Sequence, residues 1–150
     1  MILDTIVGKA TASGPAALNV IRISGDEAIK IVASIFKGPN LLLVESYTVN
    51  YGHIIDKDSV IDEVMASVFR RPRSFTSEDT VEITCHGGDF VAAEIIRLLI
   101  RQGARLAYPG EFTRRAFQNG RIDLTEAEGI MDVINARTNI QLSLAQNAIG

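Results

Sequence analysis

Apolar residues along the chain fall into short extended runs separated by stretches with helical spacing. Extended runs are expected at Thr5–Ala10, Leu18–Ile23, Ser46–Ile55, Val60–Phe69, Thr80–His86 and Ala104–Leu106. Helical spacing predicts helices over Ala28–Phe36, Asp89–Gln102 and Pro109–Gln118, and one long helix from Leu124 onward. The runs on either side of the turn at Asp56–Ser59 form a β-hairpin, and strands and helices do not alternate regularly. The sequence therefore predicts an α+β fold, with a mixed sheet flanked by helices.

Several residues indicate where helices begin. Ser24 and Glu27 fit a capping box before the first helix, and Thr125 and Glu128 fit a second one before the last. Pro109 is suited to the first position of its helix. The run Val60–Phe69 has apolar residues on both of its faces, which predicts a central strand covered on each side.

Composition and charge indicate a globular chain with one core and without the features of a secreted or membrane protein. The chain has 150 residues, 47% of them apolar, and a formal net charge of -3, so one packed core is expected and no charge footprint for nucleic acid is present. Eleven of the fifteen basic residues are arginine, mostly in 70–73, 97–105 and 114–121, which allows local anion sites. Cys85 is the single cysteine, so an internal disulfide is excluded and a place in the core is expected. Without a secretory signal or an apolar run of membrane-spanning length, the chain is expected to be cytoplasmic.

Glu82 is the strongest candidate for a ligand-binding residue. In an extended run it shares a face with Thr80, Thr84 and His86, whereas Cys85 faces the apolar side. A carboxylate there can accept two parallel N–H bonds from an amidine-like edge such as that of a pterin. The alternative is a carboxylate on an edge strand that simply faces water.

Arginines supply the other candidates. Arg22 lies beside apolar neighbours in its strand, so it either pairs with an anion such as Glu82 or lies at the strand's solvated end. Arg121 lies on a tight connector between two helices, where ligand-binding residues are common. By contrast, Arg114 or Arg115, within a helix, is expected to be an ordinary surface residue.

Other chemistry has little support. The sequence has neither a dinucleotide-binding glycine motif nor a P-loop, and its two histidines, His53 and His86, are far apart without clustered carboxylates. We therefore expect no metal site, and we assign no catalytic residue.

Several blocks of the sequence resemble the N-terminal part of the tRNA-modification GTPase family called MnmE or TrmE. They include Asp4–Val7, Ile21–Gly25, Ser74–Thr76 with Glu78-Asp79, Val81-Glu82, His86–Gly88 and, longest, Pro109–Thr113 continuing through Arg121 to Glu128. The resemblance spans essentially the whole chain.

The resemblance implies a fold similar to the tetrahydrofolate-binding domain of glycine-cleavage T-protein-like enzymes. It implies a folate-binding, dimer-forming domain over 1–120, followed over 121–150 by the first helix of a helical domain. The implied cofactor is 5-formyltetrahydrofolate or a related reduced folate, and Arg22, Glu82 and Arg121 are expected to contact it. Implied partners are a second copy of the chain, an MnmG-type flavoprotein and tRNA modified at its wobble uridine (U34). GTP, Mg and K would act only through a G domain whose motifs this chain lacks, so it should not hydrolyse GTP alone.

The run 11–17 departs from the family pattern. Its proline is displaced and one glycine is missing, which predicts a different geometry for the loop beside the ligand. Two alternatives therefore stay open: a structural dimerisation module with a degenerate folate pocket, and a module that binds RNA directly through its arginines.

Overall fold

A seven-stranded mixed sheet organises the chain. The computed structural model describes residues 4–11 and 18–134. The strands are β1 (Ile6–Lys9), β2 (Asn19–Ser24), β3 (Phe36–Lys37), β4 (Thr48–Asp56), β5 (Ser59–Phe69), β6 (Thr80–Cys85) and β7 (Arg105–Leu106), in the spatial order β3-β4-β5-β6-β2-β1-β7. Neighbouring strands are antiparallel except β1 and β7, which run parallel. The predicted hairpin of β4 and β5 and the predicted α+β class are both confirmed.

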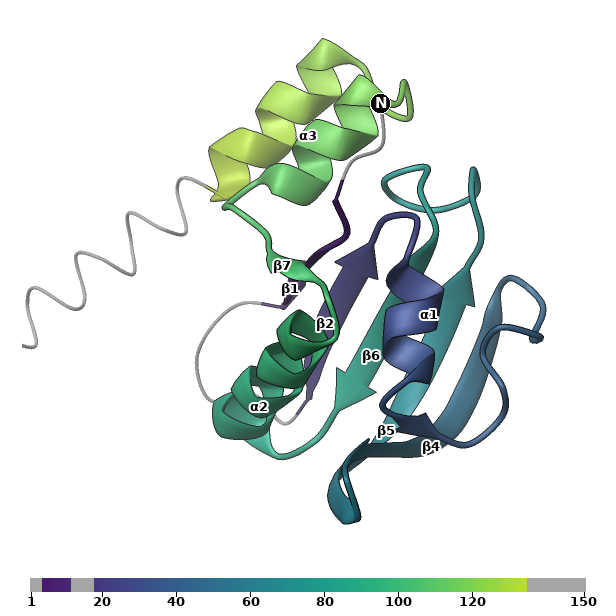
Figure 1. Cartoon of the computed structure of the whole chain (residues 1–150). Coiled ribbons are helices and arrows are strands. Elements are labelled where there is room, and N and C mark those ends of the chain that lie inside the picture. Colours follow the sequence, from purple (N-terminus) through teal and green to yellow (C-terminus); the bar gives the residue numbers. More distant parts are fainter. Residues whose placement is uncertain (1–3, 12–17, 135–150) are drawn as a thin grey trace, which may run out of the picture.

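Two helices cover one face of this sheet. They are α1 (Ala28–Ala33) and α2 (Gly88–Arg101), which lie on the same side of the strands in Figure 1. Alternate strand residues, among them Ile21, Val64 and Ile83, pack against their apolar stripes and are fully buried. Cys85 is also fully buried in this core, as predicted.

The opposite face, called here the open face, is not covered along β4 and β5. Val49, Tyr51 and Met65 point from it and keep 65%, 51% and 42% of their surface exposed. The prediction that β5 is covered on both sides is therefore wrong for the described residues. The apolar side chains on the second face of β5 leave an uncovered surface instead of a second core.

The end of β2 differs from the sequence prediction. The Ser24 hydroxyl bonds to Thr76 and Glu78, at 2.6 and 2.7 Å, and so it does not cap α1. Glu27 takes the N-cap position without a side-chain bond, so the predicted capping box is wrong. The helix is also shorter than predicted, because Phe36 already belongs to β3.

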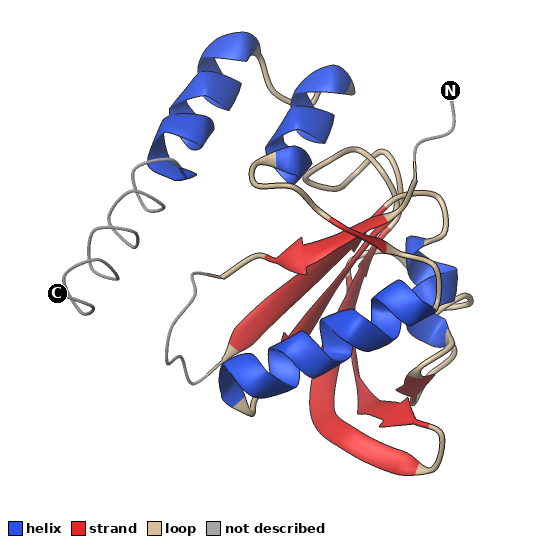
Figure 2. Ribbon diagram, turned by 60° about the vertical axis from the view of Figure 1, so that its left-hand side comes forward, coloured by secondary structure: helices blue, strands red, loops and turns tan. Residues whose placement is uncertain are grey.

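A pair of helices lies beyond one end of the sheet (Figure 2). The first is α3 (Glu111–Gln118), and the second covers 124–134. Pro109 precedes α3 instead of beginning it, because Gly110, with a φ of 76°, is the N-cap. The second helix is capped by Asp123 and Glu126, whose carboxylates each accept from the other's amide. The predicted capping box at Thr125 and Glu128, two residues later, is therefore wrong.

The division into domains at residue 120 stays a prediction, and most of the predicted long helix, residues 135–150, lies outside the described residues. Within 4–11 and 18–134, no helix is long and apolar enough to cross a membrane.

Candidate functional site

The strand register brings two of the predicted site residues together. Arg22 on β2 lies directly opposite Glu82 on β6, and Ser67 on β5 lies opposite Glu82 on its other side. Since residues opposite one another project from the same face, all three belong to the open face. The prediction that Arg22 finds an anionic partner in Glu82 is therefore supported by the backbone pairing itself.

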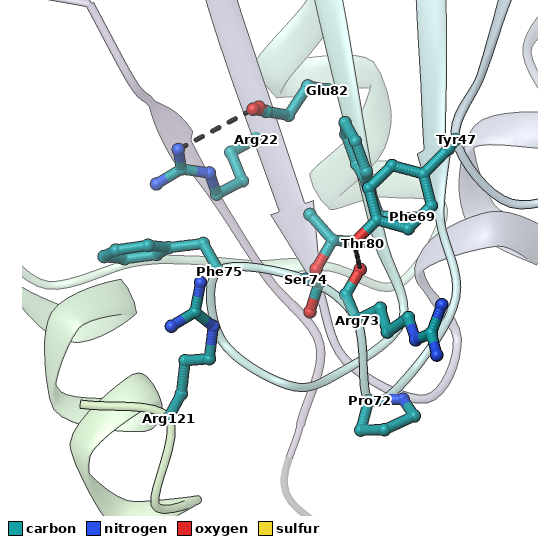
Figure 3. Close-up of a pocket in the computed structure, with 10 residues that line it drawn as sticks. All are labelled: Arg22, Tyr47, Phe69, Pro72, Arg73, Ser74, Phe75, Thr80, Glu82 and Arg121. Atoms are coloured by element: carbon teal, nitrogen blue, oxygen red, sulfur yellow. Dashed lines mark hydrogen bonds and ion pairs between the residues drawn. The ribbon is translucent and has the colours of Figure 1, made fainter.

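A cavity of about 440 Å³ opens beside this pair, and Arg121 lines it as well (Figure 3). We call it the Glu82 pocket. The structure thus gathers all three predicted residues from β2, β6 and the connector after α3. Seven more residues complete the lining, mainly aromatic and polar ones: Tyr47, Phe69, Pro72, Arg73, Ser74, Phe75 and Thr80.

The Arg22–Glu82 pair is loose and partly exposed. An Arg22 terminal nitrogen lies 3.7 Å from Glu82 Oε1, too far for a hydrogen bond, and the side chains keep 20% and 25% of their surface. In addition, Arg22 Nε is buried without a hydrogen-bond partner among the described residues. Glu82 therefore keeps its acceptor capacity for a ligand.

Two phenylalanines hold the Arg22 guanidinium in place. Its central carbon lies 4.8 Å from the ring centre of Phe75 and 5.3 Å from that of Phe112. The Phe112 ring fits because Gly8, opposite Arg22 on β1, has no side chain. A Cβ there would lie 3.2 Å from the ring.

The segment of residues 70–79, here loop 70–79, forms one wall of the pocket and is tied to the sheet and to α3. Glu78 accepts from the Ser24 hydroxyl at 2.7 Å, and Asn119 donates to the Thr76 carbonyl at 2.8 Å. The Tyr47 hydroxyl donates to the Arg73 carbonyl at 2.9 Å. The backbone that carries Ser74 and Phe75 is therefore fixed from both sides.

Arg115 is the residue that sequence reasoning missed. Arg114 is exposed, as expected of a surface residue, but the Arg115 side chain is only 3% exposed. It donates to both carboxylate oxygens of Glu78, at 3.2 and 3.3 Å, and to Asp4 at 2.8 Å. Glu111 lies 3.8 Å away. The sequence offered one signal for this role: Glu111 and Arg115 are four residues apart on one helix face.

Arg105 extends this cluster to β7. Its guanidinium donates to Asp4 and, at 3.1 and 2.6 Å, to the two carboxylate oxygens of Glu111. Two arginines and three carboxylates, Asp4, Glu78 and Glu111, thus join β1, loop 70–79, β7 and α3. We call these five residues the ionic cluster.

The cluster predicts a loss of stability in acid. The bond from Arg105 lowers the pKa of Asp4, and although burial would raise the pKa of Glu111, bonds from Arg105 and the Tyr108 amide lower it overall. Both carboxyls have pKa values below their ordinary 3.8 and 4.5, so their stabilisation is complete above about pH 5 and is lost as pH falls through the lowered values. Urea unfolding at pH 7, 5, 4 and 3 measures this, and Glu111→Gln should weaken the dependence. An unfolding midpoint that stays constant between pH 5 and 3 would contradict it.

Cys85 does not belong to the lining of the Glu82 pocket. Burial raises the pKa of the Cys85 thiol to about 11, and Cys85 faces the core, so it is no nucleophile for this pocket. Within the described residues, no three histidine, cysteine or acidic side chains are grouped to hold a metal ion.

Comparison with known proteins identifies the family. The model of the GTP-binding protein TrmE N-terminus matches residues 5–121. The chain is 55% identical over 142 residues to the tRNA modification GTPase MnmE of Streptococcus thermophilus, and 54% identical over 142 residues to that of Lactococcus lactis subsp. cremoris. It is 50% identical over 148 residues to that of Lactiplantibacillus plantarum. These matches cover 95%, 95% and 97% of the chain, but only 31%, 31% and 32% of the relatives, so the chain spans about a third of their length. The chain therefore belongs to the family defined by the TrmE N-terminus, in the region that corresponds to one end of these tRNA modification GTPases.

Proposed function

We propose that the chain binds a reduced folate, 5-formyltetrahydrofolate or a relative of it, in the Glu82 pocket. The observation that carries this proposal is the convergence of Arg22, Glu82 and Arg121 on one cavity. In this proposal the chain is the folate-binding and dimer-forming part of a tRNA modification protein.

The chemistry of the pocket fits the pterin ring. A pterin presents adjacent N–H donors in an amidine-like arrangement, which an ionised carboxylate accepts in parallel. Glu82 lies beside Arg22 and keeps part of its side chain exposed in the pocket. Phe69 and Phe75 supply flat apolar surface for the ring, and the cavity volume lies within the usual range for small-molecule sites.

Dimerisation through the open face is consistent with the exposed side chains there. Val49 and Tyr51 on β4 and Met65 on β5 form an apolar surface on the same face as Glu82. A second copy that covers this surface would also enclose the pocket. The folate site and the dimer interface are thus both proposed on the open face of the sheet.

The remaining roles are proposed for a longer protein of the kind that the relatives represent, since these relatives are about three times as long as the chain. An MnmG-type flavoprotein would use the folate's one-carbon unit at the wobble uridine of tRNA, with GTP, Mg and K bound in a separate G domain. Such a protein would work in the cytoplasm.

Titration of the chain with 5-formyltetrahydrofolate by calorimetry tests the proposal, because the ligand should saturate at one site per chain. Sedimentation equilibrium on the same sample should give a dimer. A dimer that takes up no folate would favour the structural module with a degenerate pocket. A tRNA affinity that falls steeply with salt, without folate binding, would favour the RNA-binding alternative.

A further inference from the structure

Loop 70–79 carries three arginines near the Glu82 pocket, in a chain whose net charge is negative. Arg70 donates to the backbone carbonyls of Leu41, Leu42 and Val44, and Arg71 lies 3.6 Å from the exposed Asp26 carboxylate. Arg73 is exposed, and among the described residues no carboxylate lies within ion-pair distance of its guanidinium. Two of these three cations therefore have no carboxylate partner in the described structure.

The backbone of Arg73 is held by two hydrogen bonds, although its side chain forms no hydrogen bond or ion pair within the described residues. Its carbonyl accepts from the Tyr47 hydroxyl, and its amide donates to the Arg70 carbonyl at 3.1 Å. The Tyr47 ring in turn packs edge to face on Phe69, with ring centres 5.5 Å apart. A fixed backbone that carries an unpaired guanidinium reduces the ordering cost of binding an anion.

The two ends of the pocket differ in charge. Figure 3 shows Glu82 and Arg22 together at one end and Pro72 and Arg73 at the other. A ligand whose donor-rich ring meets Glu82 would extend its other end towards Arg73. For a folate, that other end carries the glutamate carboxylates.

We propose that Arg73 binds the carboxylates of the folate's tail, and that the pocket prefers folates with several γ-linked glutamates over the monoglutamate. The inference deepens the proposed function and rests on it. Each added glutamate contributes one negative charge, and arginine meets carboxylates with its planar donor fork. The Arg71 charge contributes less, because Asp26 and the Asp79 carboxylate, which accepts from the Arg71 amide, lie beside it.

The test compares 5-formyltetrahydrofolate with one and with three glutamates by calorimetry on the full 150-residue chain. Two extra carboxylates at exposed arginines should tighten binding by about three- to tenfold at low salt. The ratio should fall towards one at about 1 M salt, where charges on the surface are screened.

Arg73→Gln should bring this ratio close to one. The variant should fold normally, because the exposed guanidinium makes no hydrogen bond or ion pair among the described residues. Arg97→Gln is the matched control, since Arg97 lies on α2, on the covered side of the sheet, paired with Glu94. It should leave the ratio unchanged.

The outcomes separate this inference from the proposed function. Equal affinities for the two folates, or a ratio that Arg73→Gln does not change, would overturn the inference and leave folate binding standing. If neither folate binds, the proposed function and the inference fall together.

Discussion

Replacing Arg115 with methionine is expected to lower the free energy of unfolding by about 3–5 kcal/mol, because the change leaves the largely buried Glu78 carboxylate without its guanidinium partner. Arg115 is almost fully buried and bonds to Glu78 and Asp4, so no water can replace its guanidinium without opening the structure. For a chain of this size the melting temperature should fall by about 10 °C. Thermal and urea unfolding followed by circular dichroism measure the effect.

Arg114→Met is the matched control, because Arg114 is exposed on the same helix. It should change the free energy of unfolding by less than about 0.5 kcal/mol. Equal effects of the two substitutions would show that the ionic cluster does not stabilise the fold. Since Arg115 holds Glu78 at the end of loop 70–79, Arg115→Met should also weaken folate binding.

Glu82→Gln is expected to weaken binding of 5-formyltetrahydrofolate by about 30- to 100-fold, equivalent to about 2–3 kcal/mol. The amide offers one acceptor and one donor, so it cannot accept two parallel N–H bonds from the pterin edge. The loss should appear in calorimetry as a rise in Kd. The fold should persist, because the Arg22 pair is long and partly exposed.

Glu94→Gln is a matched control for charge. Glu94 pairs with Arg97 on the surface of α2, which packs on the covered face of the sheet. The Glu94→Gln variant should bind the folate with the affinity of the native chain. If Glu82→Gln binds the folate with native affinity, Glu82 does not belong to the binding site, although the chain does bind folate.

Local patterns along the chain were sufficient to predict six of the seven described strands and the helix α2, but β3 was missed because Phe36 was assigned to the preceding helix. Alternation defined β5 and β6 well, and the apolar stripe together with Gly103 gave α2 within one residue of its bounds. The hairpin followed from turn residues between two extended runs. Such features depend on neighbours in the sequence, which is why a single chain suffices to predict them.

Features that depend on distant partners were not predictable in the same way. Ser24 has the sequence context of an N-cap, but its hydroxyl bonds to Thr76 and Glu78, more than fifty residues away. Arg115 has the sequence context of a surface residue, but Asp4 reaches it from the segment before β1 and Glu78 from loop 70–79. The coverage of β5 likewise depends on how many helices reach each face of the sheet.

For the site, Arg22 and Glu82 came from strand patterns and Arg121 from its place on a tight connector, and all three line one cavity. The aromatic contacts of Arg22 with Phe75 and Phe112 could not be predicted, because they require α3 to lie over Gly8. Whether the three residues hold a folate is a matter for the titrations above.

The parallel pairing of β1 with β7 has a consequence for synthesis on the ribosome. Strands β3 to β6 come from a nearly continuous stretch of chain and can pair as soon as they emerge. By contrast, the backbone hydrogen-bonding groups on the outer edge of β1 have no strand partner until residues 105 and 106 have been translated, about a hundred codons later. Until then the nascent chain exposes the unpaired edge of β1, to which a chaperone could bind.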